Sequence, residues 1–191
     1  MPGPGLKVTG GEFKGRRLRA PGKCTRVRPT SNMVKEAMFD ILAPYLRGSR
    51  VLDLFAGTGA LGIEALSRGA SEAVLVDNDP ACCRLIEQNL ALLGLNPRAR
   101  VLRMDAFLAP ARLRELGERF NLVLADPPYS SQDVSRILLA VPCVLEPRGI
   151  LVVEHSRLQA VPEALEACGR RLTLLKNRRY GDTVVSFWKG D

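Results

Sequence analysis

Short apolar runs alternate with amphipathic stretches from about residue 50 onward. Apolar runs bounded by turn residues are typical of buried strands, whereas apolar positions that recur every three or four residues predict helices. The pattern predicts strands at 51–55, 73–76, 101–104, 122–125 and 150–154, and helices at 60–68, 80–93, 112–116, 132–140 and 161–167. This alternation indicates a parallel sheet covered by helices on both faces.

The end of the chain breaks the alternation. Two strand-like runs, 171–175 and 183–188, are separated by the turn signal "RRYGD" and by no helix. They predict a hairpin that adds one antiparallel strand to the sheet. The expected fold class is therefore α/β, with a doubly wound, Rossmann-like and mostly parallel sheet.

The first 30 residues are rich in glycine, proline and basic residues. Strand-like runs at 6–9 and 17–20 flank the turn residues "GGEFKG" and predict a small hairpin. Thr30 or Ser31 can cap a helix whose apolar positions recur until Gly48. We expect a basic arm or hairpin at 1–30, a connecting helix at 31–48 and a main domain at 49–191.

Basic charge is concentrated in the same segment. Residues 1–35 hold nine Lys or Arg and one acidic residue, Glu12, for a net charge of +8, and the remaining 19 basic and 19 acidic residues cancel. A charge excess at one end predicts a contact with a polyanion, and the alternative is a solvated basic tail. The candidate contacts with the phosphates of such a polyanion are Arg16, Arg17, Arg19, Arg26 and Arg28.

Several classes of protein and site are not indicated. There is no basic-then-apolar leader and no apolar run long enough to span a membrane, so we expect a cytoplasmic protein without a membrane partner. The five cysteines form no CxxC pair and His155 is the only histidine, so no metal site is expected.

A glycine-rich loop follows the first predicted strand of the main domain. Gly57, Gly59 and Gly62 in "DLFAGTGALG" have the G-x-G-x-x-G spacing, which lets the backbone turn tightly and approach a ligand before a helix begins. Asp77 follows at the end of the next strand, where a carboxylate can bind both hydroxyls of a ribose. The loop predicts a cofactor that contains a nucleoside, and the alternative is tight strand-to-helix packing without a ligand.

Carboxylates near this loop favour one cofactor. Asp53, inside the first strand, argues against a pyrophosphate, which needs N–H donors, and suits a cofactor that carries an amino group and a cationic sulfur. S-adenosyl-L-methionine fits that description. Asp105, after the third strand, can accept a hydrogen bond from the adenine amine while Phe107 offers an apolar surface. The alternative for Asp105 is a helix cap.

The stretch "LADPPY" places a second carboxylate beside that cofactor. Asp126 ends the fourth strand, and Pro127 and Pro128 remove two N–H donors from the following turn while their carbonyls remain. A pocket lined by acceptors suits the exocyclic amine of a nucleobase, which would stack on Tyr129. For His155 we favour structural packing, and the role of Glu154 stays open.

These residues give the chain a resemblance to the class I S-adenosylmethionine-dependent methyltransferases that methylate amines. More narrowly, it resembles the RsmD-type family of 16S ribosomal RNA guanine-N2 methyltransferases. The resemblance runs nearly end to end, through "RVRPTSNMVKEAMFDIL", "VLDLFAGTGALGIEALSRGA", "DPPY", "VVEH" and "YGDT". "DPPY" alone is shared by enzymes that methylate adenine, cytosine or guanine, so the segment around "RPT" is what indicates this family.

The resemblance implies a 16S ribosomal RNA substrate within a partly assembled small subunit. It also implies that Asp126 and Pro127, with Pro128 and Tyr129, hold the target amine. The cofactor residues that it implies are Thr30, Asp53, Phe55, Gly57, Gly59, Asp77, Asn78, Asp105, Ala106 and Phe107. Met33 and Lys35 stand where relatives often carry arginines. The alternatives are a DNA adenine-N6 or cytosine-N4 methyltransferase, an NAD-dependent oxidoreductase, and an RNA-binding protein without catalytic activity.

Overall fold

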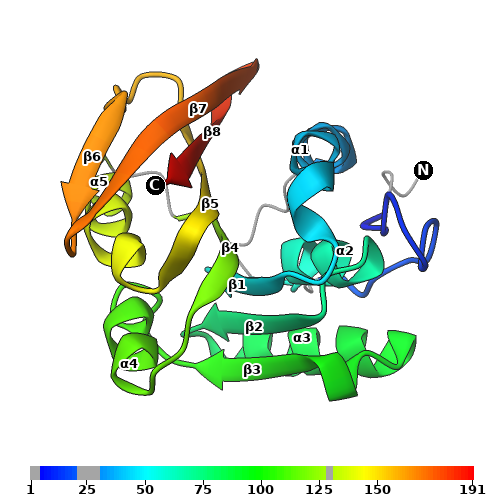
Figure 1. Ribbon diagram of the computed structural model, residues 1–191. Coiled ribbons are helices and arrows are strands. Elements are labelled where there is room, and N and C mark those ends of the chain that lie inside the picture. Colours follow the sequence, from blue (N-terminus) through cyan, green and yellow to red (C-terminus); the bar gives the residue numbers. More distant parts are fainter. Residues whose placement is uncertain (1–4, 21–30, 128–130) are drawn as a thin grey trace.

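An eight-stranded sheet forms the centre of the computed structural model, which describes residues 5–20, 31–127 and 131–191 (Figure 1). The strands lie in the order β3-β2-β1-β4-β5-β8-β7-β6. The first five in this order are parallel to one another, and β8 pairs antiparallel with β5. The doubly wound α/β fold with an antiparallel C-terminal hairpin is therefore confirmed.

The elements alternate as the apolar pattern predicts up to β5. Their bounds are α1 (Asn32–Leu46), β1 (Arg50–Leu54), α2 (Ala60–Ser67), β2 (Glu72–Asp77), α3 (Pro80–Leu93), η1 (Asn96–Arg98), β3 (Ala99–Arg103), α4 (Ala109–Glu115), β4 (Phe120–Ala125), α5 (Ser131–Ala140), η2 (Val141–Cys143), β5 (Leu145–Ser156), β6 (Ala164–Ala167), β7 (Arg170–Tyr180) and β8 (Thr183–Gly190).

Each face of the sheet is buried by its own set of helices. Val51 and Leu75 belong to the cluster that also holds residues of α1, α2 and α3, whereas Leu52 and Val74 belong to the cluster with residues of α4 and α5. Successive side chains on a strand point to opposite faces, so a strand that is buried on both sides must be apolar throughout. This is why the central strands read as continuous apolar runs.

The N-terminal arm is a short hairpin. Lys7 and Arg17 form an antiparallel bridge, and Val8 and Leu18 donate to main-chain carbonyls across it. The apolar side chains of Leu6, Val8 and Leu18 are buried in the same core cluster as α1 and α2, while the intervening basic side chains face solvent. Helix α1 follows, with the Ser31 hydroxyl accepting a hydrogen bond from the Val34 amide at 3.3 Å.

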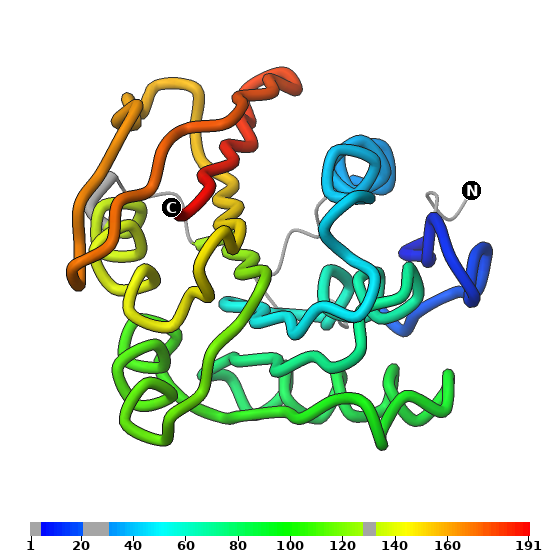
Figure 2. Tube along the Cα trace, viewed as in Figure 1, coloured from blue at the N-terminus to red at the C-terminus, as the bar shows by residue number. Residues whose placement is uncertain are grey.

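The helix expected at 161–167 is wrong, because residues 164–167 form strand β6, which pairs antiparallel with β7. Val161 and Leu165 have helical spacing, but only six residues separate Pro162 from Gly169, too few for a helix to offset the cost of its first turn. The edge of β7 offers hydrogen bonds to an extended segment instead. Figure 2 shows β6, β7 and β8 gathered at one end of the sheet.

Candidate active site

The carboxyl ends of the parallel strands bring most of the predicted site residues to one edge. Leu54 in β1 is paired with Val76 in β2 and with Ala125 in β4, and Ala125 is paired with Val153 in β5. The residues that follow these partners are Asp77, Phe55, Asp126 and Glu154. Since neighbouring strands lie about 4.8 Å apart, these four residues form one row across the centre of the sheet.

The loop between β1 and α2 needs its glycines. The φ angles of Gly57 and Gly59 are 55° and 77°, in the left-handed region that glycine adopts without strain. Phe55 lies in the same region, with a φ angle of 61°. Gly62 is required for a different reason. A Cβ atom at that position would lie 2.7 Å from a methyl of Leu75 and 3.1 Å from Oδ2 of Asp53, so the helix could not approach the strand as closely.

The amides of this loop are directed at oxygens of the protein itself. Gly57 donates to Oδ2 of Asp77 at 2.8 Å, and Gly62 donates to Oδ2 of Asp53 at 2.8 Å. Gly59 donates to the carbonyl of Ala56 at 2.7 Å. A pyrophosphate site would need such N–H groups to point at the ligand, without carboxylates in between. These three amides are therefore not directed at a pyrophosphate.

Asp53 is a buried carboxylate, with 1% of its surface exposed. Burial raises the pKa of Asp53 to about 7, and the nearby Asp77 carboxylate adds to the rise, while the hydrogen bond from Gly62 opposes it. A buried carboxylate that ionises near neutral pH is stabilised by a cation placed beside it. This property fits a ligand with an ammonium group.

Both carboxylate oxygens of Asp77 accept main-chain hydrogen bonds. Besides the bond from Gly57, its Oδ1 accepts from the amide of Asp79 at 2.9 Å. It is half-buried, and Asn78 beside it is exposed. A carboxylate oxygen has two lone-pair directions, so each oxygen of Asp77 retains the capacity for a ribose hydroxyl.

Asp105, Ala106 and Phe107 form the turn after β3. Oδ1 of Asp105 accepts from the amide of Phe107 at 2.8 Å, a local turn of the kind that aspartate commonly makes. The Phe107 ring meets the ring of Phe55 edge-on, with centroids 5.0 Å apart, and the Arg136 guanidinium lies 3.8 Å from the Phe107 centroid. No local motif marks Arg136, because α5 brings it to this ring only in the folded chain.

Asp126 follows β4 and is half-buried, and Pro127 after it is buried. Pro128, Tyr129 and Thr30, the last predicted to contact the cofactor, lie outside the described residues. The position of Asp126 between the ends of β1 and β5 agrees with the expectation that its carboxylate borders the cofactor loop. Its contact with a target amine stays a prediction.

Glu154 and His155 end the buried part of β5. His155 Nε2 lies 2.7 Å from the Ser186 hydroxyl, and Nδ1 lies 2.9 Å from the carbonyl of Ser156. Burial lowers the pKa of His155, and the contact with the Ser156 carbonyl opposes this. The ring therefore favours its neutral form and joins β5 to β8, which agrees with structural packing. Glu154 is buried, in the row that contains Asp126.

The basic arm presents the predicted arginines that can be described. Arg16, Arg17 and Arg19 are exposed, and Arg26 and Arg28 lie outside the described residues. Asn89 of α3 accepts from the amide of Arg19 at 2.8 Å and donates to the carbonyls of Arg19 and Thr58. Since Thr58 belongs to the glycine loop, the arm is joined to the candidate cofactor site through one side chain.

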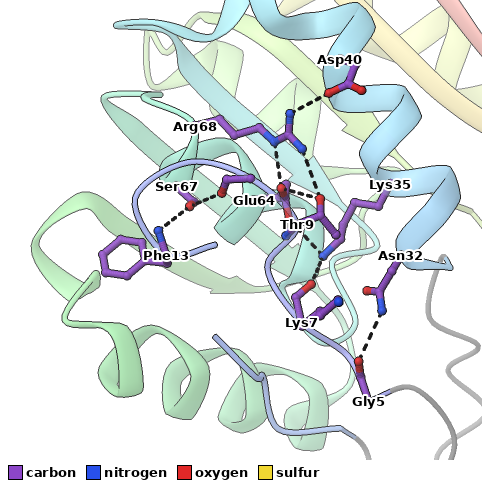
Figure 3. Close-up of polar contacts among 12 residues, drawn as sticks. Gly5, Lys7, Thr9, Phe13, Asn32, Lys35, Asp40, Glu64, Ser67 and Arg68 are labelled. Carbon is purple, nitrogen blue, oxygen red and sulfur yellow. Dashed lines mark hydrogen bonds and ion pairs between the residues drawn. The ribbon is translucent and has the colours of Figure 1, made fainter. Parts of the chain in front are cut away.

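A buried ion pair fastens the arm to the main domain (Figure 3). Lys35 of α1 and Glu64 of α2 have no exposed side-chain surface, and their charged atoms lie 3.1 Å apart. Lys35 also donates to the carbonyl of Lys7 at 2.6 Å. Lys35 is thus not part of the basic surface that its place in the charge count implied.

Glu64 accepts from further donors. The amide and hydroxyl of Thr9 each donate at 2.8 Å, and Arg68 Nε donates at 2.8 Å. Burial by itself raises the pKa of the Glu64 carboxyl, but the Lys35 ammonium and these donors together hold that pKa below its ordinary value. The carboxylate is therefore ionised and joins the arm, α1 and α2.

The described part of the chain has no group of three His, Cys, Asp or Glu residues placed to hold a metal ion. Among the same residues, no helix is both long enough and apolar enough to cross a membrane.

Comparisons with known proteins agree with this geometry. The family model described as conserved hypothetical protein 95 matches residues 6–189. The putative rRNA methyltransferase YlbH of Bacillus subtilis is 39% identical over 188 residues, which are 96% of this chain and 98% of that protein. Ribosomal RNA small subunit methyltransferase D of Escherichia coli is 40% identical over 124 residues, 65% of this chain and 60% of that protein.

A solved structure shares the whole fold. The putative methyltransferase yhhF from Escherichia coli superposes with a TM-score of 0.81 at 31% identity, over 96% of this chain and 97% of that one. Sequence and structure thus agree along almost the full length. The chain therefore belongs to the family described as conserved hypothetical protein 95, which is the family of the ribosomal RNA small subunit methyltransferase D proteins.

Proposed function

We propose that this protein transfers a methyl group from S-adenosyl-L-methionine to the exocyclic N2 amine of a guanine in 16S ribosomal RNA. The observation that carries the proposal is the row of Asp77, Phe55 and Asp126 across β2, β1 and β4, beside a glycine loop whose amides already bind carboxylates. The finer proposal is guanine 966, in a partly assembled small subunit. Both relatives, YlbH of Bacillus subtilis and methyltransferase D of Escherichia coli, have names that specify ribosomal RNA, which supports this choice of substrate.

The residues at the edge fit the three parts of the cofactor. Asp53 would compensate the ammonium, and the backbone at Phe55, Gly57 and Gly59 would approach the methionine part. Asp77, with Asn78 beside it, would bind the ribose hydroxyls. Asp105, Ala106 and Phe107 would border the adenine, with Thr30 closing over the cofactor. When bound, the cofactor supplies an electrophilic methyl group on a sulfonium.

Asp126 and Pro127 would prepare the amine for attack. The guanine N2 lone pair is delocalised into the ring, and hydrogen bonds from its two N–H groups to acceptors favour the pyramidal nitrogen. The nitrogen would take the methyl group from the sulfonium, which would become a neutral thioether, and would then give up one proton to solvent. A carboxylate at Asp126 stabilises the positive charge that develops on the nitrogen. Tyr129 would stack on the base, which must leave its own stack to enter.

The direct test is transfer of tritium from methyl-labelled S-adenosylmethionine to small ribosomal subunits that lack this modification. We expect label in 16S RNA at one guanine, and no label in duplex DNA or in subunits already modified. Label in duplex DNA instead would indicate an amino-methyltransferase of DNA. Absence of label in every RNA form would refute the proposed function.

Calorimetry separates the cofactor assignment from the substrate assignment. S-adenosylmethionine and S-adenosylhomocysteine are expected to bind, and NADH is not, because the Gly57 and Gly62 amides are directed at carboxylates. Binding of NADH without binding of S-adenosylhomocysteine would favour an oxidoreductase. Binding of both methionine cofactors without turnover on any RNA would favour a protein that has lost catalysis.

Cofactor affinity is expected to depend on pH through Asp53. Its pKa is raised to about 7, so below this pH the carboxyl is protonated and must lose its proton before it can pair with an ammonium. The dissociation constant of S-adenosylhomocysteine should rise up to about ten-fold for each pH unit below 7 and stay level above it. Methylthioadenosine has no ammonium and serves as the control. An equal pH dependence for both ligands would mean that Asp53 does not face the ammonium.

A further inference from the structure

The C-terminal end of strand β7 carries basic side chains that the proposed cofactor and base sites do not use. Arg178 and Arg179 are exposed and Lys176 is partly exposed. Arg178 and Arg179 donate to the carbonyls of Asn177 and Gly181, at 3.2 and 2.9 Å. None of the three basic residues has an ion-pair partner within the described ranges. Their positive charge is therefore available to a ligand.

Sheet register places this end of β7 at the edge that holds Asp126. Arg178 is paired with Val185 of β8, and Val185 is paired with Glu154 of β5. Glu154 follows Val153, the partner of Ala125, so it lies in the row of Asp126. Three strand spacings of about 4.8 Å separate β4 from β7, which places the Arg178 backbone roughly 14 Å from that of Asp126.

Both faces of the sheet are basic at this end. Val185 belongs to the core cluster that α1 covers, so its neighbour Arg178 points to that face, and Arg179 points to the opposite one. A guanidinium is planar, always charged and suited to two parallel hydrogen bonds with a phosphate. An exposed strand end with such groups on both sides fits a polyanionic chain better than it fits a small ligand.

The hairpin and the basic arm lie on opposite sides of α1 (Figure 1). The arm packs on α2 and α3, through Glu64 and Asn89, on the β1 and β2 side of Asp126. The β7–β8 hairpin lies beyond β5, on the other side. Basic side chains thus lie on both sides of Asp126 in the order of the sheet.

We propose that the β7–β8 hairpin, through Arg178 and Arg179 with Lys176 beside them, binds the phosphate backbone of the RNA strand that carries the target base. This inference rests on the proposed function. Phosphate contacts fix the register of a nucleic acid on a protein, whereas base contacts give specificity. Since about 14 Å separates the backbones of Arg178 and Asp126, the hairpin contacts nucleotides that flank the target rather than the target itself.

The test compares two double variants on the same strand. Arg178→Glu with Arg179→Glu removes the proposed contacts, and Arg170→Glu with Arg171→Glu makes the same charge change at the other end of β7, about 26 Å away at 3.3 Å per residue. Each protein is measured for binding to a 16S RNA fragment across a salt series, for methyl transfer and for S-adenosylhomocysteine affinity. Thermal unfolding verifies that both variants fold.

The first variant is expected to weaken RNA binding by about ten-fold or more and to make the slope of log affinity against log salt shallower by about 1.4 to 1.8. Its KM for RNA should rise by a similar factor, while kcat at saturating RNA and cofactor affinity stay unchanged. The control variant should change RNA binding less than two-fold. Equal effects of the two variants, or no effect of either, would refute the inference.

Direct RNA binding keeps this inference separate from the proposed function. Wild-type protein that binds RNA but transfers no methyl group would refute the proposed function, and the two variants would still test the hairpin. An effect of the first variant on assembled subunits but not on naked RNA would mean that the hairpin contacts a ribosomal protein, which overturns the inference. Wild-type protein that binds no RNA would refute both.

Discussion

Replacing Asp126 with alanine is expected to lower the rate of methyl transfer by about a thousand-fold, with the affinity for S-adenosylhomocysteine changed by no more than about three-fold. Asp126 follows β4, at the sheet edge that also holds the glycine loop, and in the proposed arrangement its charge acts on the target amine. Its stabilising effect is thus largest when positive charge develops on the nitrogen, and it should lower kcat more than it raises any KM. Single-turnover transfer of labelled methyl groups measures this directly.

The asparagine variant at the same position serves as the matched comparison. Its amide oxygen still accepts one hydrogen bond but carries no negative charge, so we expect a loss intermediate between that of alanine and the wild type. Equal losses for Asp126→Asn and Asp126→Ala would assign the whole effect to charge. A parallel loss of cofactor affinity and turnover in Asp126→Ala would instead place this carboxylate in the cofactor site.

The sheet edge could be predicted because its signals are local. A carboxylate or a glycine loop directly after an apolar run must lie at the carboxyl end of a parallel strand, whatever the order of the strands. Asp77, Asp105 and Asp126 were predicted in this way, whereas Asp53 lies within its strand and was predicted from the chemistry of the cofactor. The sequence could not show that Asp53 and Asp77 bind loop amides, because those bonds form between segments brought together by folding.

The errors and omissions come from contacts between distant segments. Residues 161–167 have a helical apolar spacing, but the edge of β7 determines the conformation of residues 164–167. Lys35 belongs by position to a basic segment, yet its partner Glu64 lies 29 residues further along the chain and buries it. The basic end of β7 was missed because the charge of residues 36–191 sums to zero, which conceals an uneven distribution over the surface.

Replacing Glu64 with glutamine is expected to destabilise the protein by about 3–5 kcal/mol, because it leaves the buried Lys35 ammonium without a counter-charge. Urea denaturation measures the difference. Glu115→Gln is the control, since Glu115 forms an exposed ion pair with Arg112 at 2.8 Å and should cost less than about 1 kcal/mol. Similar small losses in both variants would mean that the buried pair contributes nothing beyond an ordinary surface pair.

Two further measurements identify the buried charge as the cause. The double variant Lys35→Met with Glu64→Gln removes both charges and should be more stable than Glu64→Gln alone, because no unpaired ammonium remains. The pKa of Glu64 is lowered in the folded state, so its contribution is present above the ordinary glutamate pKa and is lost as the pH falls through the folded value. The wild type should therefore lose its advantage over Glu64→Gln in acid.

Since Glu64 also binds Thr9, the same variant should loosen the basic arm, which hydrogen exchange of the amides at residues 6–18 would detect.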